Sequence, residues 1–347
     1  MNPILGVIFH AIGGLAAGSF YAPCKKVKGW SWETYWLVLG IFAWVITPLV
    51  MASVLTPGFV GIIKAVPLSV LFWSYFFGVL WGIGGLTFGL TMRYLGISLG
   101  VSVALGFCAV FGTLVPPIFA GEFMGLVTSF SGLITLTGVT ICLLGITICG
   151  IAGMMKERDL SAEEKAEVIA EFDFKKGILV AIVAGVLSAC MAYAFQAGEP
   201  IQTLAVEKGM PAVRSNIPLL VVILLGGFTT NCIWCVWLSS KNKTFSNYGK
   251  ANEGGSLGLN YLLCMIAGVL WYLQFFFYGM GSTQMGKYDF ASWSLHMAFI
   301  IITSNVIGLL TREWKGSSRK TIQVVITGII VLILSTIVIG FGTNLTQ

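Results

Sequence analysis

Three polar or aromatic side chains recur on one face of a strongly apolar segment, WYLQFFFYGMG at residues 271–281. Trp271, Gln274 and Tyr278 are spaced three and four residues apart, so on a helix they share one side. A membrane helix keeps such a stripe when that face lines a water-accessible cavity that holds something polar. The competing interpretation is helix–helix packing together with interfacial aromatic residues, which is common in membrane bundles.

A second stripe of aromatic and ionisable side chains follows shortly after the first. Asp289, Trp293 and His296 are spaced four and three residues apart, so they too share a helical face. A carboxyl and an imidazole can take up and release protons, and an imidazole does so near neutral pH. Consecutive membrane helices run antiparallel, so we expect both stripes to face one cavity.

The first two apolar segments contain three further candidates. His10 lies inside the first segment, and it and His296 are the only histidines in the chain. Each histidine can be interpreted equally well as a hydrogen-bonded structural residue or as a proton carrier. Glu33 opens the second segment, with Trp36 about one turn further in. Glu33 either lines a cavity or pairs with a lysine at the membrane surface.

No pattern in the chain indicates catalysis or a bound metal. The Cys232-x-x-Cys235 pair has no second pair and no nearby histidine, which favours packing over a redox or metal site. The sequence HExxH does not occur, and no spacing indicates a Ser–His nucleophile pair. The sequence therefore predicts neither an enzyme nor a cofactor.

The composition places these residues in a helical membrane protein. Hydrophobic residues make up 57% of the 347, charged residues only 10%, and the mean hydropathy is +0.91. Ordinary soluble domains carry about 25% charged residues. Each span needs about 20 apolar residues to cross the lipid bilayer. Ten predicted spans meet this length: 3–23, 33–55, 68–92, 97–120, 133–155, 177–198, 216–238, 258–284, 290–310 and 321–343.

The positive charges predict which side of the membrane each loop faces. Of the 20 Lys and Arg residues, 16 fall in the loops after the odd-numbered spans and 4 in the other loops. Cytoplasmic loops carry such an excess, so we expect the odd-numbered loops in the cytoplasm and both termini outside. The charges near the first span follow its apolar stretch, so we expect a retained helix rather than a secretory signal. The net charge of +6 is explained by topology and indicates no nucleic-acid partner.

The two halves of the chain resemble each other. GVLW at 78–81 recurs at 268–271, and the same offset of 190 aligns Gly150 with Gly340. The first and sixth spans align at an offset of 171. Five spans per half place the halves in opposite orientations, a pattern typical of secondary transporters with a substrate site at the repeat interface. We predict two inverted five-helix repeats at 1–155 and 177–347, joined by a charged cytoplasmic linker at 156–176.

Four long segments resemble the signature segments of the L-rhamnose/proton symporter family, within the drug/metabolite transporter superfamily. They are FYAPCKKVKGWSWETYW (20–36), LTMRYLGISLG (90–100), WYLQFFFYG (271–279) and YDFASWSLHM (288–297). The resemblance covers essentially the whole chain. It implies a multi-pass protein of the bacterial inner membrane that imports L-rhamnose or a related 6-deoxy sugar with protons by alternating access.

Given this resemblance, we interpret the two stripes as a sugar site. Sugar hydroxyls need fixed donors and acceptors, and the C–H faces of a sugar ring pack well on Trp or Tyr. The expected proton-coupling residues are Asp289 first and Glu33 second. The alternative function is an exporter or exchanger of another small metabolite. The expected sugar-binding residues are Trp36, Trp271, Gln274, Tyr278, Trp293, His296 and His10.

Overall fold

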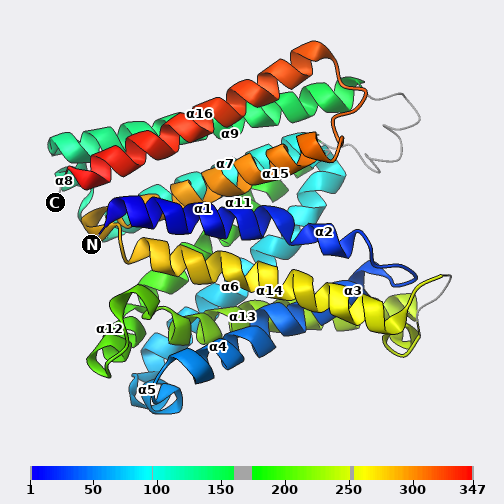
Figure 1. Ribbon diagram of the computed structural model, residues 1–347, viewed down its shortest axis with the longest axis horizontal. Coiled ribbons are helices and arrows are strands. Elements are labelled where there is room, and N and C mark those ends of the chain that lie inside the picture. The colour runs from blue at the N-terminus through cyan, green and yellow to red at the C-terminus, as the bar shows by residue number, and fades with distance from the viewer. Residues whose placement is uncertain (1, 96, 160–173, 251–253, 346–347) are drawn as a thin grey trace. The chain divides into compact units, whose positions relative to one another are not determined.

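The protein is helical throughout the described parts of the chain (Figure 1). The computed structural model describes residues 2–95, 97–159, 174–250 and 254–345. Nine helices in these ranges are long and apolar enough to cross a membrane, and Val103–Phe119 is a shorter apolar helix. The prediction of a polytopic all-helical membrane protein is confirmed.

Each predicted span has a helical counterpart, and no predicted end differs from the observed one by more than four residues. The helices are α1 (Pro3–Ser19) continued by α2 (Tyr21–Cys24), α3 (Trp32–Ile41) continued through a π-helical turn (Phe42–Ile46) into α4 (Thr47–Leu55), α6 (Leu68–Leu95), α7 (Ile97–Phe119), α9 (Phe130–Asp159), α11 (Phe174–Ala197), α13 (Ile217–Asn242), α14 (Leu257–Ser282), α15 (Ala291–Leu310) and α16 (Arg319–Asn344). Short helices lie in three connections: α5 (Phe59–Ala65), α8 (Phe123–Thr128) and α12 (Glu199–Glu207).

The π-helical turn in the second span has a local cause in the sequence. Pro48 lacks a backbone N–H, so it cannot donate to the carbonyl of Trp44, and its ring crowds that carbonyl. Just before it, the Thr47 N–H donates to the Phe42 carbonyl, five residues back, in place of the usual four. The wider turn lets the helix continue past the proline.

The chain forms two compact units, and each takes segments from both sequence halves. Unit 1 contains Met1–Leu15, Gly84–Tyr193 and Gly281–Gln347, and unit 2 contains Ala16–Ile83 and Ala194–Met280. The repeat boundaries at 155 and 177 concern internal symmetry and stay a prediction. Residues 160–173 of the predicted linker lie outside the described ranges.

In unit 1, α9 and α16 lie side by side along their whole length (Figure 1). Their contacts recur at alternating intervals of three and four residues, as in an antiparallel coiled coil. Small residues on one helix face larger ones on the other, which lets the backbones approach closely. The paired positions are Thr135–Gly342, Gly138–Ile339, Cys142–Ser335, Gly145–Leu332, Cys149–Gly328 and Ala152–Val325.

We expect Gly138→Ala to destabilise the protein, because the α9–α16 seam has no room for a methyl group. A Cβ at Gly138 would lie 2.8 Å from the backbone nitrogen of Ile339. Overpacking of this kind costs about 1–3 kcal/mol. Thermal unfolding in detergent measures the loss. The matched control is Gly106→Ala in α7, where nothing lies within 4 Å of the added Cβ. Equal melting temperatures for the two variants would contradict this account of the seam.

In unit 2, glycines bring the third and eighth spans onto the seventh and second. A Cβ at Gly268 of α14 would lie 2.7 Å from the Leu39 carbonyl oxygen of α3. Gly78 of α6 packs in the same way against the Ile223 carbonyl of α13. These close approaches position the aromatic side chains that follow Gly78 and Gly268 in the two GVLW sequences.

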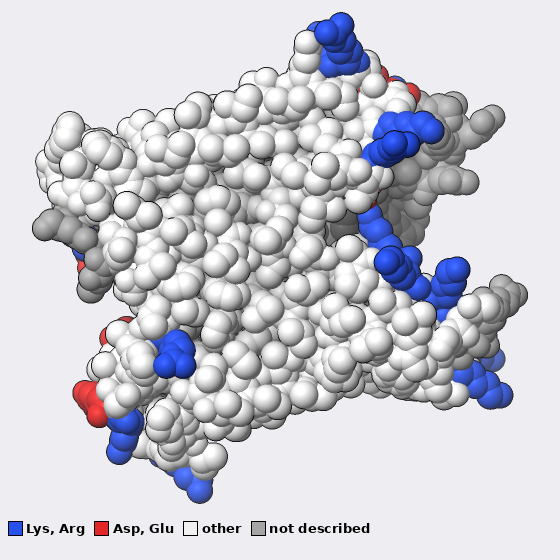
Figure 2. Space-filling view, in the orientation of Figure 1, with Lys and Arg blue, Asp and Glu red and all other residues white. Residues whose placement is uncertain are grey.

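Connections predicted to lie on the same side of the membrane contact one another within each unit. In unit 1, Asp159 at the end of α9 accepts a hydrogen bond from the Ser318 N–H (2.8 Å). In unit 2, the Trp30 indole donates to the Lys250 carbonyl (3.1 Å). All four residues lie in or beside odd-numbered loops. Lys and Arg gather at helix ends, and the helix sides between them carry neither basic nor acidic residues on the face in Figure 2.

Candidate functional site

The predicted site residues fall into two groups, each within one unit. Glu33, Trp36, Trp271, Gln274 and Tyr278 belong to unit 2. The remaining predicted residues belong to unit 1: His10, Asp289, Trp293 and His296. The expectation that the two stripes face one cavity therefore stays a prediction, and each group is described on its own.

Five tryptophans form a connected cluster in unit 2. Trp271 contacts Trp81 and Trp44, with ring centroids 5.4 Å and 5.2 Å away. Trp44 also contacts Trp36 at 6.0 Å, and Trp36 stacks on Trp32 at 5.4 Å with an interplanar angle of 16°. The rings come from α3, the π-helical turn, α6 and α14, so the cluster joins three of the four spans of this unit. It offers aromatic faces of the kind that pack on sugar C–H groups.

Gln274 lies one turn beyond Trp271 and has an amide without a partner. Its side chain is only 6% exposed, and it makes no hydrogen bond to any described residue. A buried amide left unbonded costs about 1–3 kcal/mol unless water or a ligand satisfies it. Tyr278, one turn further on, packs edge-on against Phe195 at 5.0 Å. The stripe read from the sequence thus contains a group that is able to bind a ligand.

Three residues of the cluster, Trp32, Trp44 and Trp81, were not among the sequence candidates. Trp81 was visible only as part of the GVLW repeat, and that repeat was the signal that could have identified it. Trp44 sits in a run of apolar residues, FAWVI, with no polar neighbour to mark it. The Trp36 indole donates to the Asn231 side-chain oxygen (3.0 Å), so Trp36 offers a ring face rather than a free N–H.

Glu33 is part of a hydrogen-bonded network in unit 2. The residue is 4% exposed, and its carboxylate accepts hydrogen bonds from the Asn242 amide (3.1 Å) and the Thr244 hydroxyl (2.8 Å). Both donors lie at or just beyond the end of α13. The carboxylate therefore ties the start of α3 to the segment after α13, by way of an amide and a hydroxyl.

In unit 1 the two histidines lie close together. His10 on α1 and His296 on α15 are fully buried, and their ring centroids are 6.5 Å apart. Gly281 makes room for His10, since a Cβ there would lie 2.8 Å from the imidazole. Trp293 is buried beside His296, and its indole donates to the Cys108 carbonyl (3.1 Å). The protein itself thus satisfies the Trp293 N–H.

Asp289 lies in the short connection between α14 and α15 and is exposed. The Ser292 hydroxyl donates to its carboxylate (3.0 Å). Many protein atoms nevertheless surround it, and this desolvation raises the pKa of the Asp289 carboxyl, while hydrogen bonds with Ser282 and Ser292 act in the opposite direction. A raised pKa lies closer to physiological pH, where the carboxyl can both bind and release a proton. Among the described residues, no three His, Cys, Asp or Glu side chains come together as metal ligands would.

Comparison with known proteins places the chain in a family. A profile of the L-rhamnose-proton symport protein (RhaT) family matches residues 1–345. The chain belongs to the L-rhamnose-proton symport family. L-rhamnose-proton symporters of Cronobacter sakazakii, Escherichia coli K12 and Klebsiella pneumoniae subsp. pneumoniae are each 39% identical to it over 340 residues, which is 97% of each chain. The multi-pass architecture agrees with a transporter of this family.

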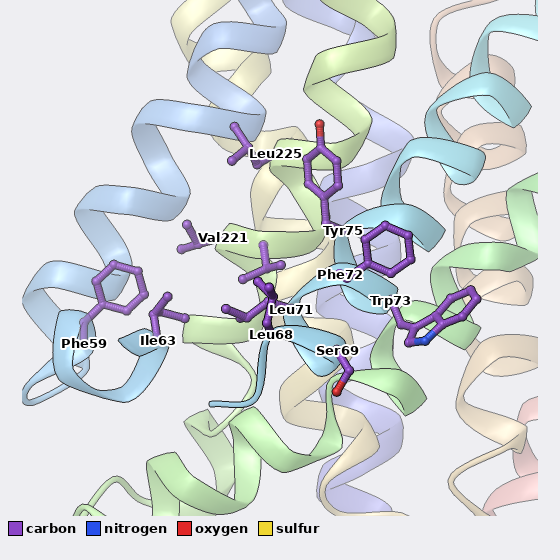
Figure 3. Close-up of a pocket in the computed structure, with 11 residues that line it drawn as sticks. Phe59, Ile63, Leu68, Ser69, Leu71, Phe72, Trp73, Tyr75, Val221 and Leu225 are labelled. Carbon is purple, nitrogen blue, oxygen red and sulfur yellow. The ribbon is translucent and has the colours of Figure 1, made fainter. Parts of the chain in front are cut away.

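A large groove on unit 2 is too apolar to hold the polar cargo of a symporter (Figure 3). Its volume is about 670 Å³, and α5, the first turns of α6 and one face of α13 line it. Among the side chains that line it, only Ser69, Trp73 and Tyr75 carry a polar atom, and the Tyr75 hydroxyl already bonds Thr229 (2.8 Å). A surface of this kind in a membrane protein suits lipid chains, so the tryptophan cluster is the better candidate site.

Proposed function

We propose that this protein imports L-rhamnose together with protons across the bacterial inner membrane by alternating access. The observation that carries the proposal is the 39% identity to L-rhamnose-proton symporters across 97% of the chain. Membrane-spanning helices along the described chain and an aromatic cluster with an unbonded amide are consistent with it.

We further propose that the two sequence halves are inverted repeats, and the contacts support this. If a two-fold axis relates the halves, every contact must recur with the two partners exchanged. In the α9–α16 seam, Gly138 packs on Ile339 and Cys149 packs on Gly328. At the offset of 190, Gly138 corresponds to Gly328 and Cys149 to Ile339. The two contacts are therefore the same contact with the two halves exchanged.

The same reciprocity occurs among the other spans. Gly6 approaches Met285, and Gly177 approaches Leu95. Gly6 corresponds to Gly177 at the offset of 171, and Leu95 corresponds to Met285 at the offset of 190, so these two contacts are also equivalent. In unit 2, the Gly268 contact with Leu39 corresponds to the Gly78 contact with Ile223, which gives an offset of 184 between the second and seventh spans. Chance matches between glycine-rich helices do not produce contacts that exchange in this way.

We place the sugar at the tryptophan cluster, in contact with Trp36, Trp271, Gln274 and Tyr278. Trp81 and Trp271 are equivalent residues of the two repeats, and their rings touch. Equivalent residues contact each other only beside the axis that relates them, and substrate sites of inverted-repeat transporters lie at the repeat interface. At the offset of 190, Gly84 and Phe88 correspond to Gln274 and Tyr278, so this polar stripe belongs to one repeat only.

For proton coupling we propose Asp289, because it lies in a connection outside the spans and desolvation by the surrounding protein atoms raises its pKa. Glu33 is the second candidate, although its bonds to Asn242 and Thr244 equally suit a structural role. Sugar contacts by Trp293, His10 and His296 stay predictions. The buried Trp293 indole already bonds within unit 1, so Trp293 has less structural support than Gln274.

Uptake of labelled L-rhamnose into proteoliposomes tests the function. We expect uptake that rises when the outside is made acidic relative to the lumen, and that a protonophore abolishes. Uptake that ignores the pH gradient would contradict symport. Efflux or exchange of another metabolite, with no gradient-driven L-rhamnose uptake, would favour the alternative of an exporter or exchanger.

We expect both termini in the periplasm, on the basis of the charge distribution. The exposed residues Lys315, after the ninth span, and Lys208, after the sixth, allow a matched test. In whole cells, a membrane-impermeant maleimide should label Lys208→Cys and should label Lys315→Cys only after the cells are opened. Seven of the eight native cysteines are buried, so background labelling should be low. The reverse pattern would invert the topology.

A further inference from the structure

The π-helical turn at Phe42–Ile46 has no counterpart in the equivalent span of the other repeat. At the offset of 184, the turn corresponds to residues 226–230 of α13, which is a continuous α-helix from Ile217 to Asn242. Trp44, at the centre of the turn, corresponds to Phe228. A sugar has no two-fold symmetry, so the residues that recognise it must differ between the repeats. Single π-helical turns within α-helices are frequent at functional sites.

The Trp44 indole N–H is buried and makes no hydrogen bond. The side chain is 2% exposed, and no atom among the described residues accepts from Nε1. Trp36, its neighbour in the cluster, has its own N–H satisfied by Asn231. An indole N–H usually finds a partner when it is buried, so an unpaired one calls for an acceptor that is absent here.

The position of Trp44 points to the origin of that acceptor. Its ring contacts both repeat-equivalent tryptophans, Trp271 at 5.2 Å and Trp81 at 6.4 Å, at interplanar angles of 88°. Trp44 thus stands edge-on to the pair that marks the repeat interface. Gly40, one turn earlier, leaves the space that the indole fills, because a Cβ there would lie 2.7 Å from its Cε3 atom.

We propose that Trp44 is a sugar-recognition residue whose indole N–H donates a hydrogen bond to one ring hydroxyl of the bound sugar. The π-helical turn created by Pro48 sets the direction of this donor. Trp81 and Trp271 supply the aromatic surface, and Trp44 adds a directional contact that the symmetric pair lacks. This inference rests on the proposed function, and it adds a residue that the polar stripe of α14 does not include.

The test pairs variants of Trp44 with sugars that lack one hydroxyl. Affinities of purified protein for L-rhamnose and for its 1-deoxy, 2-deoxy, 3-deoxy and 4-deoxy analogues are measured by isothermal titration calorimetry. Trp44→Phe removes the N–H. Replacement of Trp44 by β-(3-benzothienyl)alanine keeps both fused rings and exchanges the N–H for sulfur, so it removes the donor without changing the packing. The control is Trp73→Phe, a tryptophan that is 49% exposed in the apolar groove.

We expect both Trp44 variants to bind L-rhamnose about two- to tenfold more weakly, the range for one hydrogen bond. One deoxy analogue should lose a similar factor in the wild type and lose nothing further in the variants, because the deleted hydroxyl and the deleted N–H are the two ends of one bond. The inference alone would be overturned if all four analogues lost the same factor in the Trp44 variants as in the wild type, or if the benzothienyl variant bound L-rhamnose with wild-type affinity. Failure of the wild type to bind L-rhamnose would overturn the proposed function, and this inference with it.

Discussion

Asp289→Asn is expected to abolish accumulation of L-rhamnose against its gradient and to leave sugar binding in place. Asparagine has the size and hydrogen-bonding groups of a protonated carboxyl, but it cannot release a proton. With one proton per sugar, a gradient of one pH unit is worth about 1.4 kcal/mol, or about a tenfold accumulation. In the variant, the internal sugar concentration should rise only to the external one.

The pH dependence of sugar binding should disappear in the same variant. If Asp289 couples the two ligands, protons tighten sugar binding by the factor by which sugar tightens proton binding. Binding by Asp289→Asn should therefore equal that of the wild type at low pH and stay there as the pH rises. Glu122→Gln, which removes an exposed carboxylate before α8, is the matched control and should behave as the wild type. Accumulation by Asp289→Asn would move the coupling role to Glu33, and then to His10.

Gln274→Leu is expected to weaken L-rhamnose binding by about 1–3 kcal/mol, or roughly 5- to 150-fold in Kd. The sugar hydroxyl that met the amide would be buried without a partner. The stability of the protein should not fall, because the Gln274 amide bonds no described residue and leucine is close to it in size. Calorimetry and thermal unfolding of the same preparation separate the two effects.

A second glutamine provides the comparison for this variant. Gln323 is exposed on α16, so Gln323→Leu makes the same chemical change away from the proposed site. Unchanged affinity in folded Gln274→Leu protein would place the sugar elsewhere. A large loss of stability in Gln274→Leu would instead indicate that the Gln274 side chain has a structural role in helix packing.

The sequence predicted those features that depend on one helix at a time. Runs of apolar residues identified the ten helical segments, and the spacing of Trp271, Gln274 and Tyr278 identified a stripe with an unbonded amide. Features that depend on contacts between distant segments escaped it. The partners of Glu33 lie about 210 positions away and are neutral, so no charge pattern signalled them. The sequence did not identify Trp44 as a candidate site residue, because its unpaired N–H and the π-helical turn cannot be recognised in a run of apolar residues.

The interleaved units were also beyond the sequence. A repeat in the chain indicates which segments are equivalent, but not whether a repeat packs with itself or with its counterpart. Here the glycines that mark the repeat mostly pack against the other half. Gly78 meets α13 and Gly268 meets α3, so each compact unit draws on both halves.

The alternation of small and large residues between α9 and α16 also restricts how these helices can move. A slide by one helical turn would place Gly138 opposite Gly342, which leaves a void, and would press Ile339 against Cys142. No intermediate position fits better, because each bulky side chain has one glycine or other small residue opposite it. The two helices therefore keep their register, and we expect them to move as one rigid body. The rearrangements that carry a solute across the membrane are therefore expected to leave these two helices in register with each other.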